Sequence, residues 1–227
     1  MTMRICVSIF PKNGAEAQRL IKISEVAKAD LIEVRLDRLE SSTNLKEIIN
    51  SSKIPLVATH KLTGEHGFFS GTEAERQQSL LNAAENGFEY VDVDLSSSNR
   101  QETIDKLKQL GAKPIVSHHE YEGALSHSAM DKVLEQEILS GASVCKIVVT
   151  ARKIEDNLAV LNFVASHSEK AKLVCFCMGE AGKVSRLLSP MFGAFFTFAS
   201  LEQGAETAKG QMSIGEMKAA YNLLEAR

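Results

Sequence analysis

An apolar run that contains a single lysine is the part of the sequence most suggestive of chemistry. Residues 143–150 read Ser-Val-Cys-Lys-Ile-Val-Val-Thr, and in a strand Lys146 would share a face with Val144 and Val148. A charge inside a sheet that is covered on both faces is costly unless it is paired or neutralised. Lys146 therefore either extends to water from a strand end or is a desolvated amine that attacks a carbonyl to form a Schiff base.

Charged residues alternate with apolar ones in two other runs. Glu33, Arg35 and Asp37 share one strand face, and Asp92 and Asp94 share a face of another strand. A solvated edge strand would show this alternation. A closed barrel has no edge, so there the polar faces would line the interior and their charges would have to compensate each other.

A fifth run ends in Ser117-His118-His119-Glu120, which places Ser117 and His119 on one face and His118 on the other. A histidine at a strand end can be purely structural. Beside carboxylates and an arginine on neighbouring strands, however, an imidazole is suited to general acid–base catalysis near neutral pH.

Three polar loops could complete a site. Residues 59–67 are polar and contain two glycines, and residues 177–186 contain two glycines followed by Ser185 and Arg186. The second loop could bind an anion through backbone N–H groups and the guanidinium. Residues 207–211 are small and polar and could form a lid. Taken singly, each loop is better explained as an ordinary connection.

Short apolar runs alternate with amphipathic stretches along the whole sequence, which predicts repeated βα units and a parallel sheet. Eight runs are predicted strands: Ile5 to Phe10, Leu31 to Leu36, Pro55 to His60, Tyr90 to Leu95, Pro114 to His119, Val144 to Thr150, Leu173 to Met178 and Phe195 to Phe198. Helices are predicted at Ala15 to Lys28, Glu73 to Asn86, Gln101 to Leu110, Met130 to Ser140, Ile154 to Ser166 and Ser213 to Glu225. Gly87, Gly111 and Gly141 are suited to helix C-caps.

Eight such units in 227 residues fit an α/β fold of the (β/α)8 TIM-barrel type. We expect a single barrel domain over residues 1–227, with the active site at the carboxyl ends of the strands. An open doubly wound sheet is the alternative. It is disfavoured because no Gly-x-Gly-x-x-Gly motif follows the first predicted strand.

The composition points to a small-molecule partner. The formal net charge is −3 and no run of five basic residues occurs, which argues against a nucleic-acid surface. The sequence opens directly into a strand pattern, without signal-peptide features, and contains no apolar stretch of 18 residues. We therefore expect a cytoplasmic protein that does not associate with membranes.

The cysteines favour reduced core thiols over a disulfide framework, because all four lie in apolar runs: Cys6, Cys145, Cys175 and Cys177. A metal site made of Cys175, Cys177 and the His118-His119 pair is disfavoured because no Cys-x2-Cys spacing accompanies it. We expect no metal in the site.

Several motifs occur in a fixed order and spacing. They are Glu-x-Arg-x-Asp at 33–37, Ser-x-His-acid-aromatic at 117–121, a lysine 27 residues after His119, Met-Gly-x-x-Gly-x-x-Ser-Arg at 178–186, Phe-Gly-x-x-x-Thr-Phe at 192–198 and Gly-Gln at 210–211. Together they resemble the type I 3-dehydroquinate dehydratases, Schiff-base enzymes of the shikimate pathway of aromatic amino acid biosynthesis. The resemblance covers the whole chain. It implies a (β/α)8 barrel, 3-dehydroquinate as substrate, no cofactor or metal, and a homodimer.

The resemblance also implies roles for individual residues. Lys146 would condense with the substrate ketone, His119 would be the general acid–base, and Glu65 would orient and tune that histidine. The implied substrate-binding residues are Ser8, Glu33, Arg35, Gln211 and, for the carboxylate, Arg186, with Asp92 pointing into the barrel. Two positions depart from the family pattern: Lys61 stands where arginine is common, which removes a bidentate contact, and Thr207 stands where serine is common, which keeps the hydroxyl.

The chemistry explains why a lysine and a histidine are needed together. An iminium withdraws electrons from the neighbouring carbon, so that an imidazole can remove its proton without a cofactor. An ordinary lysine is protonated at neutral pH, so the apolar strand and a neighbouring Arg35 would have to favour the neutral amine. A class I aldolase on the same barrel would share Lys146, and a catalytically silent sensor of shikimate-type acids is a more distant alternative.

Overall fold

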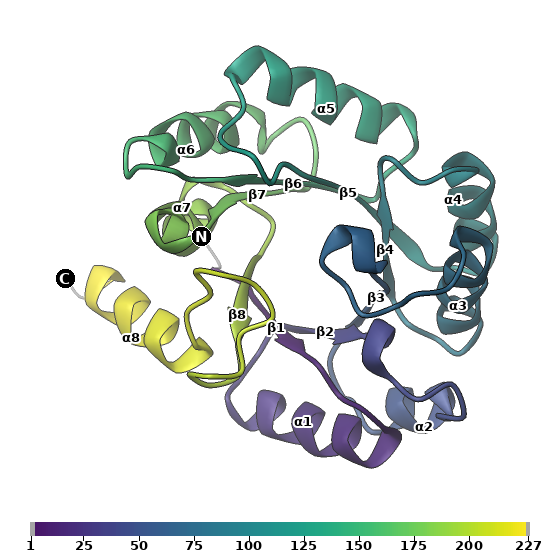
Figure 1. Ribbon diagram of the computed structural model, residues 1–227. Coiled ribbons are helices and arrows are strands. Elements are labelled where there is room, and N and C mark those ends of the chain that lie inside the picture. The colour runs from purple at the N-terminus through teal and green to yellow at the C-terminus, as the bar shows by residue number, and fades with distance from the viewer. Residues whose placement is uncertain (1–2, 226–227) are drawn as a thin grey trace.

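The computed structural model, which describes residues 3–225, contains one eight-stranded parallel sheet that curls into a barrel, with the helices outside it (Figure 1). The strands are β1 (Ile5–Ile9), β2 (Leu31–Arg35), β3 (Leu56–Thr59), β4 (Tyr90–Asp94), β5 (Lys113–His119), β6 (Val144–Thr150), β7 (Leu173–Met178) and β8 (Thr197–Ser200). The helices are α1 (Gly14–Val26), α2 (Leu45–Asn50), α3 (Glu73–Glu85), α4 (Arg100–Gln109), α5 (His127–Leu139), α6 (Asp156–His167), α7 (Lys183–Leu188) and α8 (Ile214–Glu225). The predicted (β/α)8 barrel is confirmed.

The strand order closes the sheet almost completely. It runs β7-β6-β5-β4-β3-β2-β1-β8, and every hydrogen-bonded pair is parallel. The order follows the chain without the reversal that a doubly wound sheet would show. β7 and β8 are the two edges of the sheet and face each other across a seam, where the Phe195 N–H donates to the Leu173 carbonyl at 2.8 Å.

Most predicted elements are found where expected, with three differences. Strands β6 and β7 have the predicted bounds, whereas β8 begins two residues later than expected, at Thr197. The strand that carries Glu33 ends at Arg35, and Asp37 lies in a single 3-10 turn. Helices α2 and α7 are not among the predicted helices, because six residues are too few to show a helical repeat of apolar positions.

Local sequence signals set the helix ends. The Thr72 N–H donates to the Glu75 carboxylate at 2.7 Å and the Glu75 N–H donates to the Thr72 hydroxyl at 3.3 Å, which is a capping box at the start of α3. Gly87, Gly111 and Gly141 follow α3, α4 and α5 with φ of 103°, 81° and 84°. Only glycine adopts this conformation without strain, so the predicted C-caps are confirmed.

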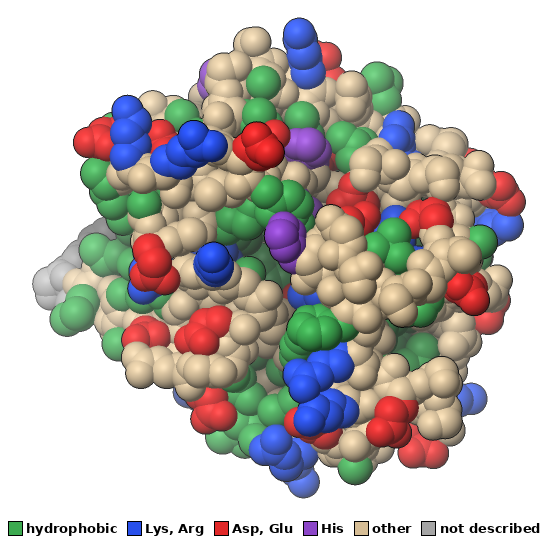
Figure 2. All heavy atoms as spheres, in the orientation of Figure 1, with side chains coloured by type: hydrophobic (Ala, Val, Ile, Leu, Met, Phe, Trp, Pro, Cys, Tyr) green, Lys and Arg blue, Asp and Glu red, His purple; other side chains and the backbone are tan. Residues whose placement is uncertain are grey.

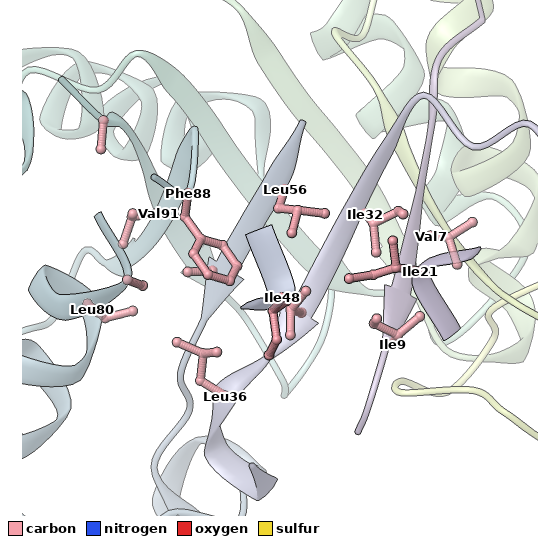
Figure 3. Close-up of a cluster of buried hydrophobic side chains, with 14 of the residues drawn as sticks. Val7, Ile9, Ile21, Ile32, Leu36, Ile48, Leu56, Leu80, Phe88 and Val91 are labelled. Atoms are coloured by element: carbon pink, nitrogen blue, oxygen red, sulfur yellow. The ribbon is translucent and has the colours of Figure 1, made fainter. Parts of the chain in front are cut away.

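Apolar side chains of the strands point alternately outward and inward, which gives the barrel two kinds of core. On the outside, Val7 and Ile32 face Ile21 of α1 and Ile48 of α2 (Figure 3). Inside the barrel, the cluster consists of Cys6, Leu31, Val57, Tyr90, Ile115, Val144, Val148, Val174, Phe176, Phe196 and Phe198. The two sets of positions follow the period of two expected for strands that are buried on both faces.

The four cysteines are free and buried, as expected for core thiols. Cys6 lies in the cluster inside the barrel, and Cys145, Cys175 and Cys177 lie in the layer between the sheet and its outer helices. Within residues 3–225, no helix has both the length and the apolar character needed to cross a membrane.

Candidate active site

Lys146 is a buried ammonium inside the barrel. Its side chain shares the inner face of β6 with Val144 and Val148, as predicted, and the residue is 4% exposed. The Nζ atom lies 2.8 Å from Oδ2 of Asp92 and 4.6 Å from the centre of the Phe198 ring. The alternative in which Lys146 reaches water is therefore wrong. The charge is compensated by a carboxylate on β4 and by the face of an aromatic ring.

A second buried lysine shares the same carboxylate. The Nζ atom of Lys61 lies 3.4 Å from Oδ1 of Asp92 and 3.3 Å from Oδ2 of Asp94. Burial opposes the charge of Lys61, but Asp92 and Asp94 outweigh it and raise the pKa of Lys61 above its usual value. Burial acts to raise the pKa of both aspartates. Lys146 and Lys61 nevertheless hold the pKa of Asp92 below its usual range. His119 and Lys61 do the same for the pKa of Asp94.

His119, at the end of β5, is placed to act as a neutral base. Burial and the nearby Lys61 lower the pKa of His119 to about 4, although Asp94 acts in the opposite direction. Its Nδ1 atom lies 3.9 Å from Oδ2 of Asp94. The imidazole is therefore uncharged at neutral pH and can accept a proton, and the Asp94 carboxylate lies where it stabilises the resulting imidazolium.

The structure does not bring the carboxylate of Glu65 to His119. Glu65 ends a 3-10 turn after β3, and its carboxylate forms an ion pair with Arg76 at 2.9 Å. The backbone carbonyl of Glu65 accepts a hydrogen bond of 3.3 Å from the Tyr121 hydroxyl. The carboxylate beside the histidine is that of Asp94. In the sequence, Asp94 is visible only as part of a polar strand face, and no pattern there assigns it a role.

Hydroxyl and amide groups connect the first strands with the loop after β8. The Ser8 hydroxyl donates to the Glu33 carboxylate, which also accepts a hydrogen bond of 2.8 Å from Thr59. The Thr207 hydroxyl donates to Ser8 at 3.0 Å, and Gln211 Nε2 donates to Thr207 at 3.0 Å. Four of the predicted binding residues, Ser8, Glu33, Thr207 and Gln211, are thus joined in one network.

The loop that contains Thr207 and Gln211 also packs against the loop after β7. The Gly179 N–H donates to the Lys209 carbonyl at 3.1 Å. Gly210 has a φ of 76°, and a Cβ atom there would lie 2.1 Å from the Gly179 carbonyl oxygen. Glycine is required at this position by both the conformation and the close approach. In Figure 1 this loop lies across one side of the barrel opening.

Arg35 lies at the carboxyl end of β2, but it is not the cation beside Lys146 that we expected. Its guanidinium forms two hydrogen bonds of 2.7 Å with the Asp37 carboxylate and lies 4.8 Å from the Phe10 ring centre. The cation that shares the carboxylate partner of Lys146 is Lys61. Arg35 is thus held in a bidentate pair at the barrel opening.

Arg186 is buried without a carboxylate partner among the described residues. It lies in α7, is 1% exposed, and its Cζ atom is 4.2 Å from the centre of the Phe176 ring. Its Nε atom has no hydrogen-bond acceptor in the part of the chain that the structure describes. Burial lowers the pKa of Arg186 to about 10, which leaves it charged at neutral pH. A buried cation without an anion in the protein is suited to form charge-assisted hydrogen bonds with an acidic ligand.

The start of α7 is fixed so that Arg186 points into the barrel. The Ser185 hydroxyl accepts a hydrogen bond of 2.9 Å from the Cys177 N–H, and the Ser185 N–H donates to the Asn157 side chain at 2.9 Å. The Thr197 hydroxyl donates to the Arg186 carbonyl at 2.6 Å. These contacts tie α7 to β7, α6 and β8.

The site combines an amine, a base and two sets of polar binding groups around one recess. Figure 2 shows a hollow near the centre of the face seen in Figure 1, bordered by hydrophobic and histidine side chains. Such a site fits a carbonyl compound that carries a carboxylate and several hydroxyl groups. Among residues 3–225, the one grouping with the spacing of metal ligands is His127, Asp131 and His167, which lies outside this site.

Comparisons with known proteins agree with this geometry. Residues 5–227 match the family model described as Type I 3-dehydroquinase. The chain is similar to the 3-dehydroquinate dehydratase of Dehalococcoides mccartyi, with 36% identity over 217 residues that cover 96% of this chain and 94% of the relative. It is also similar to the enzyme of that name from Methanothermobacter thermautotrophicus, with 33% identity over 216 residues, or 94% of each chain.

Solved structures show the same fold. The 3-dehydroquinate dehydratase of Geobacillus kaustophilus superposes with a TM-score of 0.90 at 21% identity, over 100% of this chain and 93% of that chain. The 3-dehydroquinate dehydratase of Aquifex aeolicus superposes with a TM-score of 0.81 at 26% identity, over 99% of this chain and 100% of that chain.

Proposed function

The chain belongs to the type I 3-dehydroquinase family and is a 3-dehydroquinate dehydratase, and on that premise we propose that Lys146 forms the Schiff base through which water is lost. The product is 3-dehydroshikimate, an intermediate of the shikimate pathway. The observation that best supports this role is the burial of Lys146, 2.8 Å from Asp92, in a barrel that also holds a neutral His119. A buried lysine paired with a carboxylate, close to a histidine whose pKa is lowered by burial, is the kind of environment that functional sites provide.

Substrate binding begins with the carboxylate. Arg186 lacks an anion among the described residues, so the substrate carboxylate supplies the missing charge and forms charge-assisted hydrogen bonds. Glu33, Arg35 and Gln211 bind the ring hydroxyls, and Ser8 and Thr207 support them through the network described above. Lys61 stands where an arginine is common in the family. Its ammonium lies between Asp92 and Asp94, so it does not offer the substrate the bidentate contact of an arginine.

The amine must be neutral before it attacks the ketone. Asp92 lies 2.8 Å from the Nζ atom of Lys146 and 3.4 Å from that of Lys61, so the two lysines share one carboxylate. The second basic group at this carboxylate is Lys61, where the sequence led us to expect Arg35.

His119 carries the protons. It removes a proton from the carbon next to the iminium, which leaves an enamine and an imidazolium that Asp94 stabilises from 3.9 Å. The imidazolium then gives its proton to the departing hydroxyl, so that water leaves and a conjugated iminium forms. Hydrolysis of this iminium releases the product ketone and restores the Lys146 amine.

We propose that Asp94, and not Glu65, is the carboxylate that orients His119, because the Glu65 carboxylate is engaged by Arg76. An aldolase would also use Lys146, but it would not require the unpaired Arg186, and the curated relatives are named as dehydratases.

We further propose that residues 1–227 act as one domain, that two copies form a homodimer, and that the enzyme works in the cytoplasm, where a biosynthetic dehydratase is expected. Light scattering of the purified protein measures the number of copies.

The experiment that tests the Schiff base is borohydride reduction in the presence of substrate or product, followed by peptide mass mapping. The wild type and His119→Ala should each retain an adduct on the peptide that contains Lys146, although slower proton transfer reduces the yield in the variant. Lys146→Met should retain none and should have no measurable turnover. An adduct on Lys61 in Lys146→Met would overturn the assignment. Circular dichroism establishes that each variant is folded.

A further inference from the structure

Two histidines and an aspartate converge on the outside of the barrel, where α5 lies beside α6 (Figure 1). His127 and Asp131 come from α5 and His167 comes from α6. One potential ligand atom from each of the three lies within 4.8 Å of the other two. None of the three belongs to the proposed catalytic machinery.

The hydrogen bonds of His167 leave one nitrogen aimed at a carboxylate. Its Nδ1 atom lies 2.9 Å from the Phe163 carbonyl, which can only accept, so Nδ1 carries a proton and donates it. Its Nε2 atom lies 2.9 Å from Oδ1 of Asp131. With the Nδ1 proton directed to the carbonyl, the Nε2 lone pair and the Asp131 carboxylate can face one shared cation. The bond from Nδ1–H to a backbone carbonyl is the usual support of a metal-binding histidine.

The remaining geometry favours a shared cation. His127 and Asp131 are four residues apart, so they lie on one face of α5. His167 is the last residue of α6, where the unpaired carbonyls of the helix end attract positive charge. The Phe163 ring stacks on His167 with 4.3 Å between ring centres and meets His127 edge-on at 5.1 Å, which restricts both imidazoles. His127 is exposed, so an ion can enter from solvent and keep water in an open position.

We propose that His127, Asp131 and His167 bind a divalent transition-metal ion of the Zn²⁺ class and that the ion holds α5 against α6. Two imidazole nitrogens and one carboxylate oxygen form a donor set that suits Zn²⁺ and its neighbours, whereas Mg²⁺ and Ca²⁺ require mostly oxygen ligands. The site is separate from the catalytic groups, so it does not alter the expectation that the reaction itself uses no metal. Its role is structural.

The test is a calorimetric titration of the EDTA-treated and dialysed protein with Zn²⁺. The wild type should bind one Zn²⁺ per chain, and His127→Ala should weaken this binding by at least about tenfold. His66→Asn is the matched control, because it removes an exposed imidazole in another loop and asparagine tolerates the φ of 59° at that position. This control should bind Zn²⁺ with the affinity of the wild type. Asp131→Asn should weaken binding as His127→Ala does.

Thermal unfolding gives an independent readout. An ion that binds only the folded state raises the melting temperature, so saturating Zn²⁺ should stabilise the wild type and His66→Asn but not His127→Ala. The same difference in the absorbance of bound Co²⁺ would identify the ligands directly. Failure of the wild type to bind Zn²⁺ would overturn the proposal, as would equal affinities in the wild type and both site variants.

Discussion

Two fully buried arginines have different roles in this barrel: one is paired with carboxylates of the protein, and the other has no such partner among the described residues. Arg76, in α3, is 2% exposed and forms ion pairs with Glu65 at 2.9 Å and with Glu73 at 2.7 Å. Arg186, in α7, is 1% exposed and rests on Phe176, with no carboxylate partner among residues 3–225. Burial opposes the charge of both. The carboxylates nevertheless raise the pKa of Arg76 above its usual value, whereas the pKa of Arg186 is lowered to about 10.

The two arginines distinguish a charge that stabilises the fold from a charge that is available to a ligand. The charge of Arg76 is compensated within the protein, where it joins the loop after β3 to α3 and also contacts Ser97. The charge of Arg186 can be compensated by the carboxylate of a bound ligand. Burial alone would not separate the two residues; the presence or absence of a partner does.

Replacing each arginine by methionine, which keeps most of the side-chain volume, separates these roles most sharply. In Arg186→Met, the lost charge-assisted pair with the substrate carboxylate should raise KM by about 100-fold or more, because truncating one partner of such a pair costs roughly 2–5 kcal/mol. The free energy of unfolding should stay within about 1 kcal/mol of the wild type, because no internal ion pair is lost. Steady-state kinetics and urea denaturation measure the two quantities. A wild-type KM combined with a large loss of stability would show that Arg186 stabilises the fold and does not bind the substrate.

The opposite pattern is expected for Arg76→Met. Removing this guanidinium leaves Glu65 and Glu73 unpaired, and we expect the free energy of unfolding to fall by about 2–3 kcal/mol, less than for a fully buried pair because both glutamates are partly exposed. KM should change by less than about threefold. Urea denaturation of this variant beside Arg186→Met makes the comparison direct. A KM that rises as far as in Arg186→Met would show that Arg76 also serves the ligand.

Asp94 and Glu65 can also be distinguished by substitution, because we propose that only Asp94 orients His119. Asp94→Asn removes the charge beside His119 and should lower kcat by about tenfold or more, because the imidazolium loses its stabilising partner. Glu65→Gln should change kcat by less than about twofold and should cost about 1 kcal/mol of stability, since it only weakens the pair with Arg76. Measured kcat values decide between the residues. A larger loss in Glu65→Gln would return the orienting role to Glu65.

The smallest expected effect concerns the protonation of His119. Its neutral form is the base, so the active form is lost only as the pH falls through about 4, well below the usual range for histidine. Because this pKa is lower in the folded than in the unfolded protein, folding stability also declines as the pH falls from about 6.5 towards 4. Lys61→Met should raise the pKa of His119 and Arg76→Met should leave it unchanged. NMR titration of the assigned imidazole measures both values. A normal pKa in the wild type would contradict the proposed environment.

The sequence predicts the barrel and the central residues because both rest on periodicity. Alternation within β6 places Lys146 among inward-facing residues, and the polar face of β4 carries Asp92 to it. The run that contains Arg186 was recognisable because two glycines precede it. The alternation within each strand and the glycines before Arg186 are patterns among residues close together in the chain, whereas the contact between Lys146 and Asp92 joins two different strands.

The remaining features depend on contacts between distant segments. The loop after β3 directs the Glu65 carboxylate towards Arg76 on α3 and away from His119, which is why we propose Asp94 as the partner of His119. Sequence reasoning did not single out Arg76, because an arginine in an amphipathic helix gives no sign that it is buried. Asp37 lies beyond the end of its strand, yet it still pairs with Arg35 because the 3-10 turn folds back.

The seam between β7 and β8 lies at the two elements that we propose bind the substrate. Arg186 follows β7 in the chain and Gln211 follows β8, so a ligand held by both side chains acts as a removable cross-link between the two edges of the sheet. Local opening that separates these edges then requires release of the ligand. Amide hydrogens of β7 and β8 should therefore exchange more slowly with product bound, while those of β3 and β4 change little. The bound substrate would thus add a second connection across a seam where the backbone hydrogen bond from Phe195 to Leu173 is the one described above.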